Sequence, residues 1–226
     1  MISDGGDGDD KIILGGSNLE RAIGGDGDDI IYGTEIDVDF AMPGPMSIYG
    51  DISALQLLAD DSLASIGGDD KIYGGDGLQG FQSIYAGPGN DFVLVGSNGA
   101  STVLVHGDNP SVGGPAIVED ATGLNIADGD DIIDMGNNHN GLVKMYGQGG
   151  NDKLIGGYAD LPGVTQTEYL FGGSGDDKIW MVNPEERSFD VTTKNYGYGG
   201  LGNDFLYGSD YGDLLIADEY YKTTPV

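Results

Sequence analysis

The sequence predicts an all-β fold in which short parallel strands stack along one axis. Three observations carry this prediction. A nine-residue unit rich in glycine and aspartate recurs about nine times along the 226 residues. Glycine accounts for 43 of the 226 residues, or 19 %, against an average usage of roughly 7 %. Aspartate supplies 31 of the 38 acidic residues, an excess that favours turns, since glutamate would serve equally well for solubility alone.

The nine-residue unit combines a turn with a strand. Its glycines, within positions 1 to 6, permit positive φ and close approach of the backbone. Positions 7 to 9 suit a short strand whose central apolar residue points inward, and stacking would bury these residues in a narrow column. Ordinary Asp-Gly hairpin turns are the alternative, which the regular recurrence disfavours. The units are Gly5–Ile13 (GGDGDDKII), Gly24–Tyr32 (GGDGDDIIY), Ser65–Tyr73 (SIGGDDKIY), Ala86–Leu94 (AGPGNDFVL), Ile126–Asp134 (IADGDDIID), Gly147–Ile155 (GQGGNDKLI), Gly172–Trp180 (GGSGDDKIW), Gly199–Tyr207 (GGLGNDFLY) and, loosest of all, Gly208–Ile216 (GSDYGDLLI).

These units resemble the nonapeptide GGxGxDxUx of the repeats-in-toxin, or hemolysin-type calcium-binding, family, where U is a large apolar residue. The resemblance spans essentially the whole chain. It implies a single domain, residues 1–226, folded as a right-handed parallel β-roll (a β-solenoid) with loop insertions. It also implies about seven to eight bound Ca²⁺ ions, held by turn carbonyls and by the aspartate at position 6. The expected metal-site residues are Asp10, Asp29, Asp70, Asp91, Asp131, Asp152, Asp177, Asp204, Asp213, Asp7, Asp26, Gly8, Gly27, Gly175 and Gly202.

The spacing of the position-6 aspartates predicts that calcium lines one edge of the roll. From Asp10 to Asp204 the spacings are 19, 41, 21, 40, 21, 25 and 27, near one or two coils of about 18 residues. The intervening half-coils are degenerate, so we expect the second edge to carry the insertions and to depend on packing. Asp213 falls on that second edge and is the least secure ligand. The residues expected at the degenerate ligand positions are Glu20, Met46, Gln82, Ser101, Val143 and Glu168.

Two long gaps interrupt the repeats, at Gly50–Ala64 and Val105–Asn125. The first includes several leucines and is compatible with a short amphipathic helix that leaves the roll. An extra degenerate coil is equally compatible, since short apolar runs discriminate poorly between these structures. The second gap is likewise compatible with either a projecting loop or an extra coil.

Composition excludes several classes of partner. A net charge of −29 leaves nothing to neutralise phosphates, so nucleic acid is not expected as a partner. With no cysteine there are no disulfides or thiolate sites, and no run of 18 apolar residues predicts a transmembrane helix. High charge is also a signature of disorder, but 38 % hydrophobic residues and 13 tyrosines at regular intervals favour order that depends on a cation.

Catalytic motifs are absent, so we expect no enzymatic activity from this chain. Neither HExxH nor GxSxG occurs, and His106 and His139 fall in Gly/Asn-rich stretches that predict exposed loops. Aromatic residues recur at position 9 of the units and predict stacked ladders on the faces of the roll. Such ladders serve self-stacking or form a docking surface for a protein or glycan partner. These aromatic residues are Tyr32, Tyr73, Trp180 and Tyr207, and Tyr49, Tyr85, Tyr146 and Phe171 in the degenerate half-coils, with Tyr198 also directly preceding a Gly-Gly turn.

The family resemblance implies a function and a location. Its members are secreted bacterial toxins, adhesins, surface-layer proteins, proteases, lipases and alginate epimerases. We therefore expect an extracellular or cell-surface structural module that folds on binding calcium, or a subunit of a larger assembly. The alternative is the non-catalytic accessory module of a secreted enzyme whose catalytic domain lies outside this chain. The first residues, Met1-Ile2-Ser3-Asp4, do not have the pattern of a secretory signal peptide.

Overall fold

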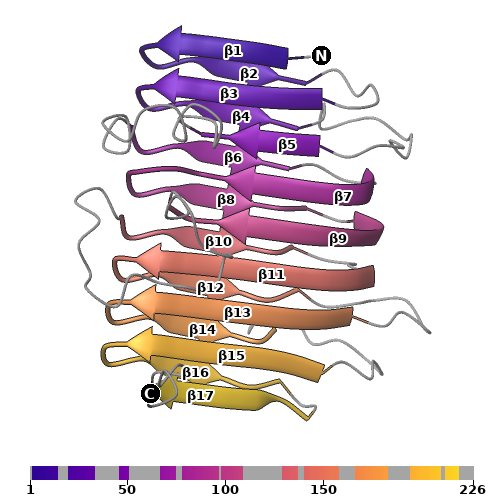
Figure 1. Cartoon of the computed structure of the whole chain (residues 1–226), viewed down its shortest axis with the longest axis vertical. Coiled ribbons are helices and arrows are strands. Elements are labelled where there is room, and N and C mark those ends of the chain that lie inside the picture. The colour runs from indigo at the N-terminus through magenta and orange to yellow at the C-terminus, as the bar shows by residue number, and fades with distance from the viewer. Residues whose placement is uncertain are drawn as a thin grey trace, which may run out of the picture.

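Two parallel β-sheets make up the described part of the protein. The structure is a computed structural model that describes residues 2–14, 20–33, 46–50, 67–74, 78–96, 98–108, 129–136, 140–157, 166–182, 194–209 and 212–218. Within these ranges the fold is all-β and contains no helix. Successive strands alternate between a 9-stranded sheet A and an 8-stranded sheet B. Figure 1 shows the strands stacked from β1 at the top to β17 at the bottom, with sheet A in front of sheet B. This arrangement is compatible with a β-solenoid.

The strands of sheet A are longer than those of sheet B. Sheet A contains β1 (Ile2–Asp7), β3 (Glu20–Asp26), β5 (Met46–Tyr49), β7 (Leu78–Tyr85), β9 (Asn98–His106), β11 (Asn140–Gly149), β13 (Gln166–Ser174), β15 (Lys194–Leu201) and β17 (Leu214–Asp218). Sheet B contains β2 (Lys11–Ile13), β4 (Ile30–Tyr32), β6 (Lys71–Tyr73), β8 (Phe92–Leu94), β10 (Ile132–Asp134), β12 (Lys153–Ile155), β14 (Lys178–Trp180) and β16 (Phe205–Tyr207). We call one sheet A strand with the sheet B strand that follows it a rung. The chain passes from sheet A to sheet B at the aspartate edge and returns at the second edge.

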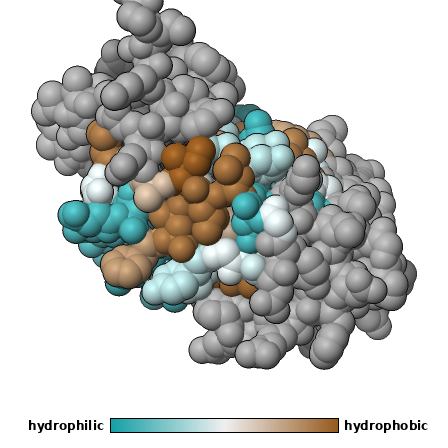
Figure 2. Space-filling view, turned by 90° about the horizontal axis from the view of Figure 1, so that it is seen from below, coloured by the Kyte–Doolittle hydropathy of each residue, from teal (hydrophilic) through white to brown (hydrophobic). Residues whose placement is uncertain are grey.

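The core is a single column of apolar residues between the two sheets. Position 8 of each repeat supplies the sheet B half of this column, as the alternation of side chains predicts. Ile31 and Ile72 from sheet B and Ile48 and Ile84 from sheet A are completely buried. Figure 2 looks along the stack from the β17 end, where apolar surface is visible between the sheets. At this end the core residues Leu206 and Leu215 are only partly buried.

Sheet pairing excludes an extra coil in either long gap. Strand β4 pairs directly with β6, and β5 with β7, so no strand separates them. The same holds for β8 with β10 and β9 with β11. Residues 51–66 and 109–128 each interrupt a turn between a sheet A strand and the next sheet B strand, and their own conformation lies outside the described residues. The expectation that insertions belong to the second edge holds only in part: residues 34–45, 158–165 and 183–193 connect a sheet B strand to the next sheet A strand at that edge, whereas these two segments lie at the aspartate edge.

The register of sheet A corrects one predicted half-coil. Val103 pairs with Gln82 on one side and with Val143 on the other, whereas Ser101 pairs with Gly80 and Gly141. Val103, and not Ser101, therefore occupies the position that corresponds to the ligand position. Matching this half-coil to the nonapeptide sets it two residues out of register and so leaves His106 outside strand β9.

Candidate metal centre along the aspartate edge

The turns at the aspartate edge depend on glycine at positions 2 and 4. In the second rung Gly25 has φ of 118° and Gly27 has φ of 132°. A side chain at Gly27 would also place its Cβ 2.7 Å from the carbonyl carbon of Gly8 in the neighbouring rung. Both the backbone conformation and the close stacking of turns thus require glycine. The four glycines predicted at position 4 all have positive φ, namely Gly8, Gly27, Gly175 and Gly202.

The eight predicted position-6 aspartates form one continuous column, which we call the inner ladder. The main-chain N–H of each of these aspartates except the last, Asp204, donates to Oδ1 of the aspartate in the following rung. Asp29 donates to Asp70 at 2.8 Å and Asp70 donates to Asp91 at 2.8 Å, although 41 and 21 residues separate the partners in sequence. The members of the inner ladder are Asp10, Asp29, Asp70, Asp91, Asp131, Asp152, Asp177 and Asp204.

The second carboxylate oxygen is what marks the inner ladder as a candidate site. Asp29, Asp70, Asp91 and Asp131 are only 1 to 2 % exposed, and in each of them Oδ2 is buried without a hydrogen-bond donor. A buried acceptor without a partner is costly in a protein interior. A ligand that binds oxygen would remove this cost.

Main-chain carbonyls lie next to these carboxylate oxygens. An added Cβ at Gly24, at position 1 of its turn, would collide with both Asp29 Oδ2 and the carbonyl oxygen of Gly50 in the next rung. An added Cβ at Gly50 would meet Asp70 Oδ2 and the carbonyl oxygen of Ala86 in the same way. Each glycine therefore leaves room beside a carboxylate oxygen of its own turn and a carbonyl oxygen of the neighbouring turn.

Burial shifts the ionisation of the inner ladder. Desolvation raises the pKa of Asp70 to about 9 and that of Asp91 to about 8. The pKa of Asp131 is also raised, first by burial and then by the nearby charges of Asp108, Asp91 and Asp152. These carboxylates hold a negative charge near neutral pH only at a free-energy cost, and a bound cation or a proton offsets that cost.

The donor set fits calcium better than a transition metal. In the described ranges no three or more His, Asp or Glu side chains converge as a metal cluster would require. These turns instead place a buried carboxylate oxygen beside a main-chain carbonyl oxygen of the neighbouring turn. Calcium accepts six to eight oxygen ligands, backbone carbonyls included, in irregular geometry. Structural zinc sites are built from cysteine and histidine ligands, which these turns do not supply.

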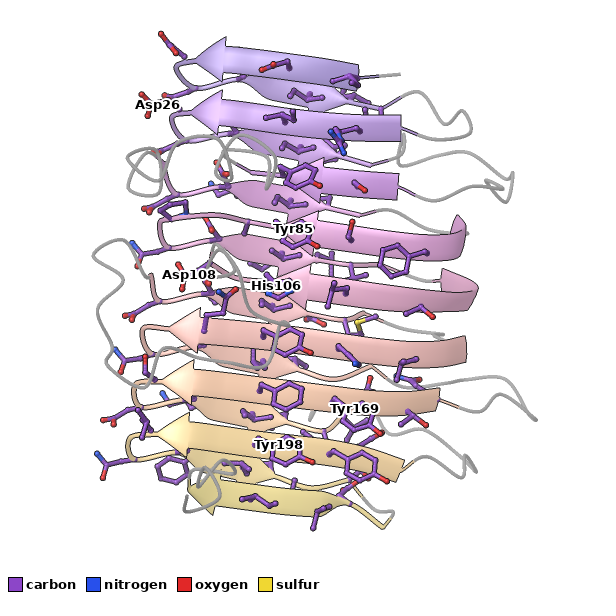
Figure 3. All side chains as sticks on the ribbon, in the orientation of Figure 1. Asp26, Tyr85, His106, Asp108, Tyr169 and Tyr198 are labelled. Carbon is purple, nitrogen blue, oxygen red and sulfur yellow. The ribbon has the colours of Figure 1, made fainter. Side chains whose placement is uncertain are left out.

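Asp7 and Asp26, which were expected to belong to the metal site, have exposed side chains. Figure 3 shows Asp26 at the outer tip of its turn. The carbonyl oxygen of Asp26 accepts a hydrogen bond from the Gly8 N–H at 2.5 Å. Only the main chain of these two residues lies within the stack of turns, so any contribution to a cation would come from their carbonyls.

A second, exposed column runs beside the inner ladder and escaped the sequence analysis. We call it the outer ladder. Its hydrogen bonds run in the opposite direction: Asp28 N–H donates to Asp9 Oδ1 at 3.2 Å, and Asp69 N–H donates to Asp28 Oδ1 at 3.0 Å. The signal was present in the sequence, because position 5 is Asp or Asn in eight of the nine units. The outer ladder consists of Asp9, Asp28, Asp69, Asn90, Asp130, Asn151, Asp176 and Asn203.

Asp108 is a further residue that the sequence analysis missed. It is 1 % exposed, and it lies just before the insertion at 109–128. Its Oδ1 accepts from the Gly129 N–H at 3.1 Å and its Oδ2 accepts from the Gly149 N–H at 3.2 Å. Asp108 therefore ties the two ends of the interrupted turn together. Figure 3 shows it on the same side of the stack as Asp26.

Asp213 lies on the second edge, as its register predicts, and outside the inner ladder. Its carboxylate accepts hydrogen bonds from Ser209, with Oγ at 3.1 and 2.9 Å from the two carboxylate oxygens. At this edge the sheet register aligns Glu20, Met46, Gln82, Val103, Val143, Glu168 and Asn195. The second edge thus has no continuous column of aspartates within the described residues.

His106 belongs to an aromatic ladder and not to an exposed loop, which corrects the sequence prediction. It is 2 % exposed and stacks between Tyr85 and Tyr146, with ring centroids 5.1 and 4.7 Å away. Its Nδ1 lies 3.1 Å from Gln148 Oε1. Burial lowers the pKa of His106 to about 4, and the bond to Gln148 only partly opposes this shift. His139 lies outside the described residues.

The predicted stacking of position-9 aromatics is confirmed on both sheets. On sheet A the ladder is Tyr49, Tyr85, His106, Tyr146, Phe171 and Tyr198, whose successive centroids lie 4.7 to 5.1 Å apart. Figure 3 shows Tyr85, His106 and Tyr198 along one line of the sheet. On sheet B the stacks are pairs, Tyr32 with Tyr73 and Trp180 with Tyr207. A docking role for these rings stays a prediction.

Comparison of the chain with protein-family models, curated proteins and solved structures gave no match. The likeness to the repeats-in-toxin family therefore rests on the nonapeptide alone. The part of the chain that the structure describes contains no helix with the length and apolar character to span a membrane.

Proposed function

We propose that this chain is a calcium-binding structural module in which a row of Ca²⁺ ions along the aspartate edge is required for folding. The observation that carries the proposal is the inner ladder, whose buried Oδ2 atoms in Asp29, Asp70, Asp91 and Asp131 have no donor within the protein. Each of these oxygens belongs to a glycine-rich turn that stacks directly on the next turn. Calcium bound between adjacent turns would satisfy them.

Charge supports the coupling of folding to calcium. The chain carries a net charge of −29, and eight carboxylates are stacked in one column. Self-repulsion of this size opposes a compact state. Because the ligands are brought together only when the turns stack, the free energy of calcium binding is also free energy of folding.

The likeness of the repeats to the nonapeptide supports two further parts of the proposal, the type of fold and the location of the protein. We assign the fold to a right-handed parallel β-roll of the repeats-in-toxin type, and the setting to the calcium-rich outside of a cell. In such a setting the chain would serve as a structural or adhesive module. Its two sheets of parallel strands and their single apolar column support this assignment.

A calcium titration of the metal-stripped chain tests the proposal. Circular dichroism should show little strand structure in chelator and a cooperative gain of strand structure at millimolar calcium. Magnesium should fold the chain poorly even in tenfold excess, because it prefers a strict octahedron and keeps its waters. A strand spectrum that is the same in chelator and in calcium would refute the coupling of folding to metal.

A further inference from the structure

A buried polar cluster lies at the second edge, where the sequence predicts no row of calcium ions. Gln166 and Glu168 lie on β13 and Asn195 lies on the neighbouring β15, and their exposed fractions are 2, 0 and 3 %. The Gln166 side-chain amide donates to Glu168 Oε1, which also accepts from the Gly157 N–H at 2.8 Å. The Asn195 side-chain amide donates to the carbonyl oxygen of Met181 at 3.3 Å.

Three side-chain oxygens in this cluster have no hydrogen-bond donor. They are Glu168 Oε2, Gln166 Oε1 and Asn195 Oδ1, and all three are buried. One unsatisfied acceptor in a protein interior is already uncommon. Three acceptors in adjacent residues of two paired strands indicate that an electropositive partner belongs among them.

The space next to Glu168 repeats the geometry of the aspartate edge. An added Cβ at Gly156 would lie 2.5 Å from Glu168 Oε2 and 2.6 Å from the carbonyl oxygen of Met181. At Gly24 the same position lies between an aspartate Oδ2 and the carbonyl oxygen of the next rung. Each edge thus has its own glycine, carboxylate oxygen and carbonyl oxygen, and the three are arranged in the same way at both edges.

A second carboxylate adds negative charge to the cluster. Tyr196 pairs with Leu214 in the sheet, which places Asp213 beside Asn195. Burial raises the pKa of Glu168 to about 8. The hydrogen bonds from Gly157 and Gln166 oppose this shift, and the negative charge of Asp213 adds to it. At the equivalent position the three preceding rungs carry the uncharged residues Val143, Val103 and Gln82, whereas this end of the second edge carries both Glu168 and Asp213.

We infer that a calcium ion binds at the second edge between Glu168 Oε2 and the Met181 carbonyl oxygen, with the amide oxygens of Gln166 and Asn195 as neutral ligands. This site goes beyond the proposed row along the aspartate edge and does not depend on it. Its ligands come from strands β13 and β15 and from the turn after β14, so the ion ties two successive rungs together. The competing arrangement is a protonated Glu168 that donates to the Met181 carbonyl oxygen.

Native mass spectrometry of the full chain at saturating calcium tests the site by counting bound ions. Glu168→Gln should bind one ion fewer than the wild type, because the amide keeps the shape of the side chain but loses the charge. Asp176→Asn is the matched control: it removes one charge from the exposed outer ladder, where Asp176 Oδ1 accepts from the Asn203 N–H at 2.8 Å, and it should bind as many ions as the wild type.

The outcomes separate this site from the aspartate edge. Equal numbers of ions in the wild type and Glu168→Gln would overturn the second-edge site and leave the aspartate edge unaffected. A wild type without any bound ion would overturn both. A crystal of the wild type grown with Tb³⁺ provides a test that needs no variant: an anomalous peak between Glu168 and Met181 is expected, and its absence with peaks along the inner ladder would refute the second-edge site alone.

Discussion

The two carboxylate oxygens of a buried aspartate in the inner ladder have different interactions. Oδ1 of Asp29 accepts the Asp10 N–H at 2.8 Å and so joins two rungs directly. Oδ2 of the same residue has no donor and lies beside the Gly50 carbonyl oxygen. An asparagine can replace the first function but not the second, because its Nδ2 is a donor and carries no charge. This difference allows the hydrogen-bonded ladder and the metal site to be separated experimentally.

Replacing Asp29 with Asn should change stability in opposite directions with and without calcium. In chelator the variant should be more stable than the wild type, because a buried carboxylate is removed and Nδ2 gains the Gly50 carbonyl as an acceptor. In calcium its folding midpoint should move to a several-fold higher concentration, because one ligand charge is lost. A calcium titration measures the second effect, and the residual strand signal in chelator, followed by circular dichroism, measures the first.

Asp28→Asn is the matched control for this prediction. Asp28 is the adjacent residue, carries the same charge and is exposed on the outer ladder, where its Oδ1 accepts from the Asp69 N–H. Asparagine preserves that bond, and exposed charges contribute less than about 1 kcal/mol. If Asp28→Asn and Asp29→Asn shifted the calcium midpoint equally, the inner ladder would not be the ligand column.

At the scale of elements, the sheet A ladder places a titratable ring inside an aromatic stack. His106 is the only histidine in the described residues, and its neighbours along the ladder are tyrosines. A positive charge at this buried position would be poorly solvated, and this is why burial depresses the pKa of His106. The ladder therefore favours the neutral ring.

His106→Phe should remove a pH-dependent contribution to stability. The folded pKa of about 4 lies below the unfolded value of 6.5, so this contribution is fully present above pH 6.5 and is lost as the pH falls towards 4. The difference between the folded and unfolded pKa values corresponds to about 3 kcal/mol of unfolding free energy. Unfolding free energies in saturating calcium at pH 4.5 and 7 should diverge more for the wild type than for His106→Phe. An equal change in unfolding free energy between the two pH values for both proteins would show that His106 titrates normally in the folded protein.

The sequence predicted those features that repeat at short range. The inner ladder follows from a nonapeptide in which the turn glycines and Asp29 are close neighbours in the chain, so motif and geometry coincide. His106 was misplaced because residues inserted at the second edge shift the half-coil that contains Ser101 and Val103. The cluster around Glu168 was not predicted, since Gly156, Glu168, Met181 and Asn195 come together only through sheet pairing across two insertions.

For the molecule as a whole, the proposed function implies that protons and calcium would compete for the same buried oxygens. The chain carries a net charge of −29, and burial raises the pKa of Asp70 to about 9 and of Asp91 to about 8. Without metal, protonation is the remaining way to neutralise these groups in the folded state. With metal, the same protonation would displace ligands from the ion.

The pH dependence of stability should therefore reverse when calcium is added. For the metal-stripped chain the folded pKa values lie above the unfolded value of 3.8, so these aspartates contribute stability below pH 4 that is lost as the pH rises through about 8 to 9. The metal-stripped chain should accordingly be more folded at pH 6.5 than at pH 9.5. In saturating calcium the order should be the opposite, because deprotonated aspartates bind the ion. Circular dichroism at the two pH values, with and without calcium, gives the four measurements required. A preference for low pH under both conditions would mean that the inner ladder binds protons and not calcium.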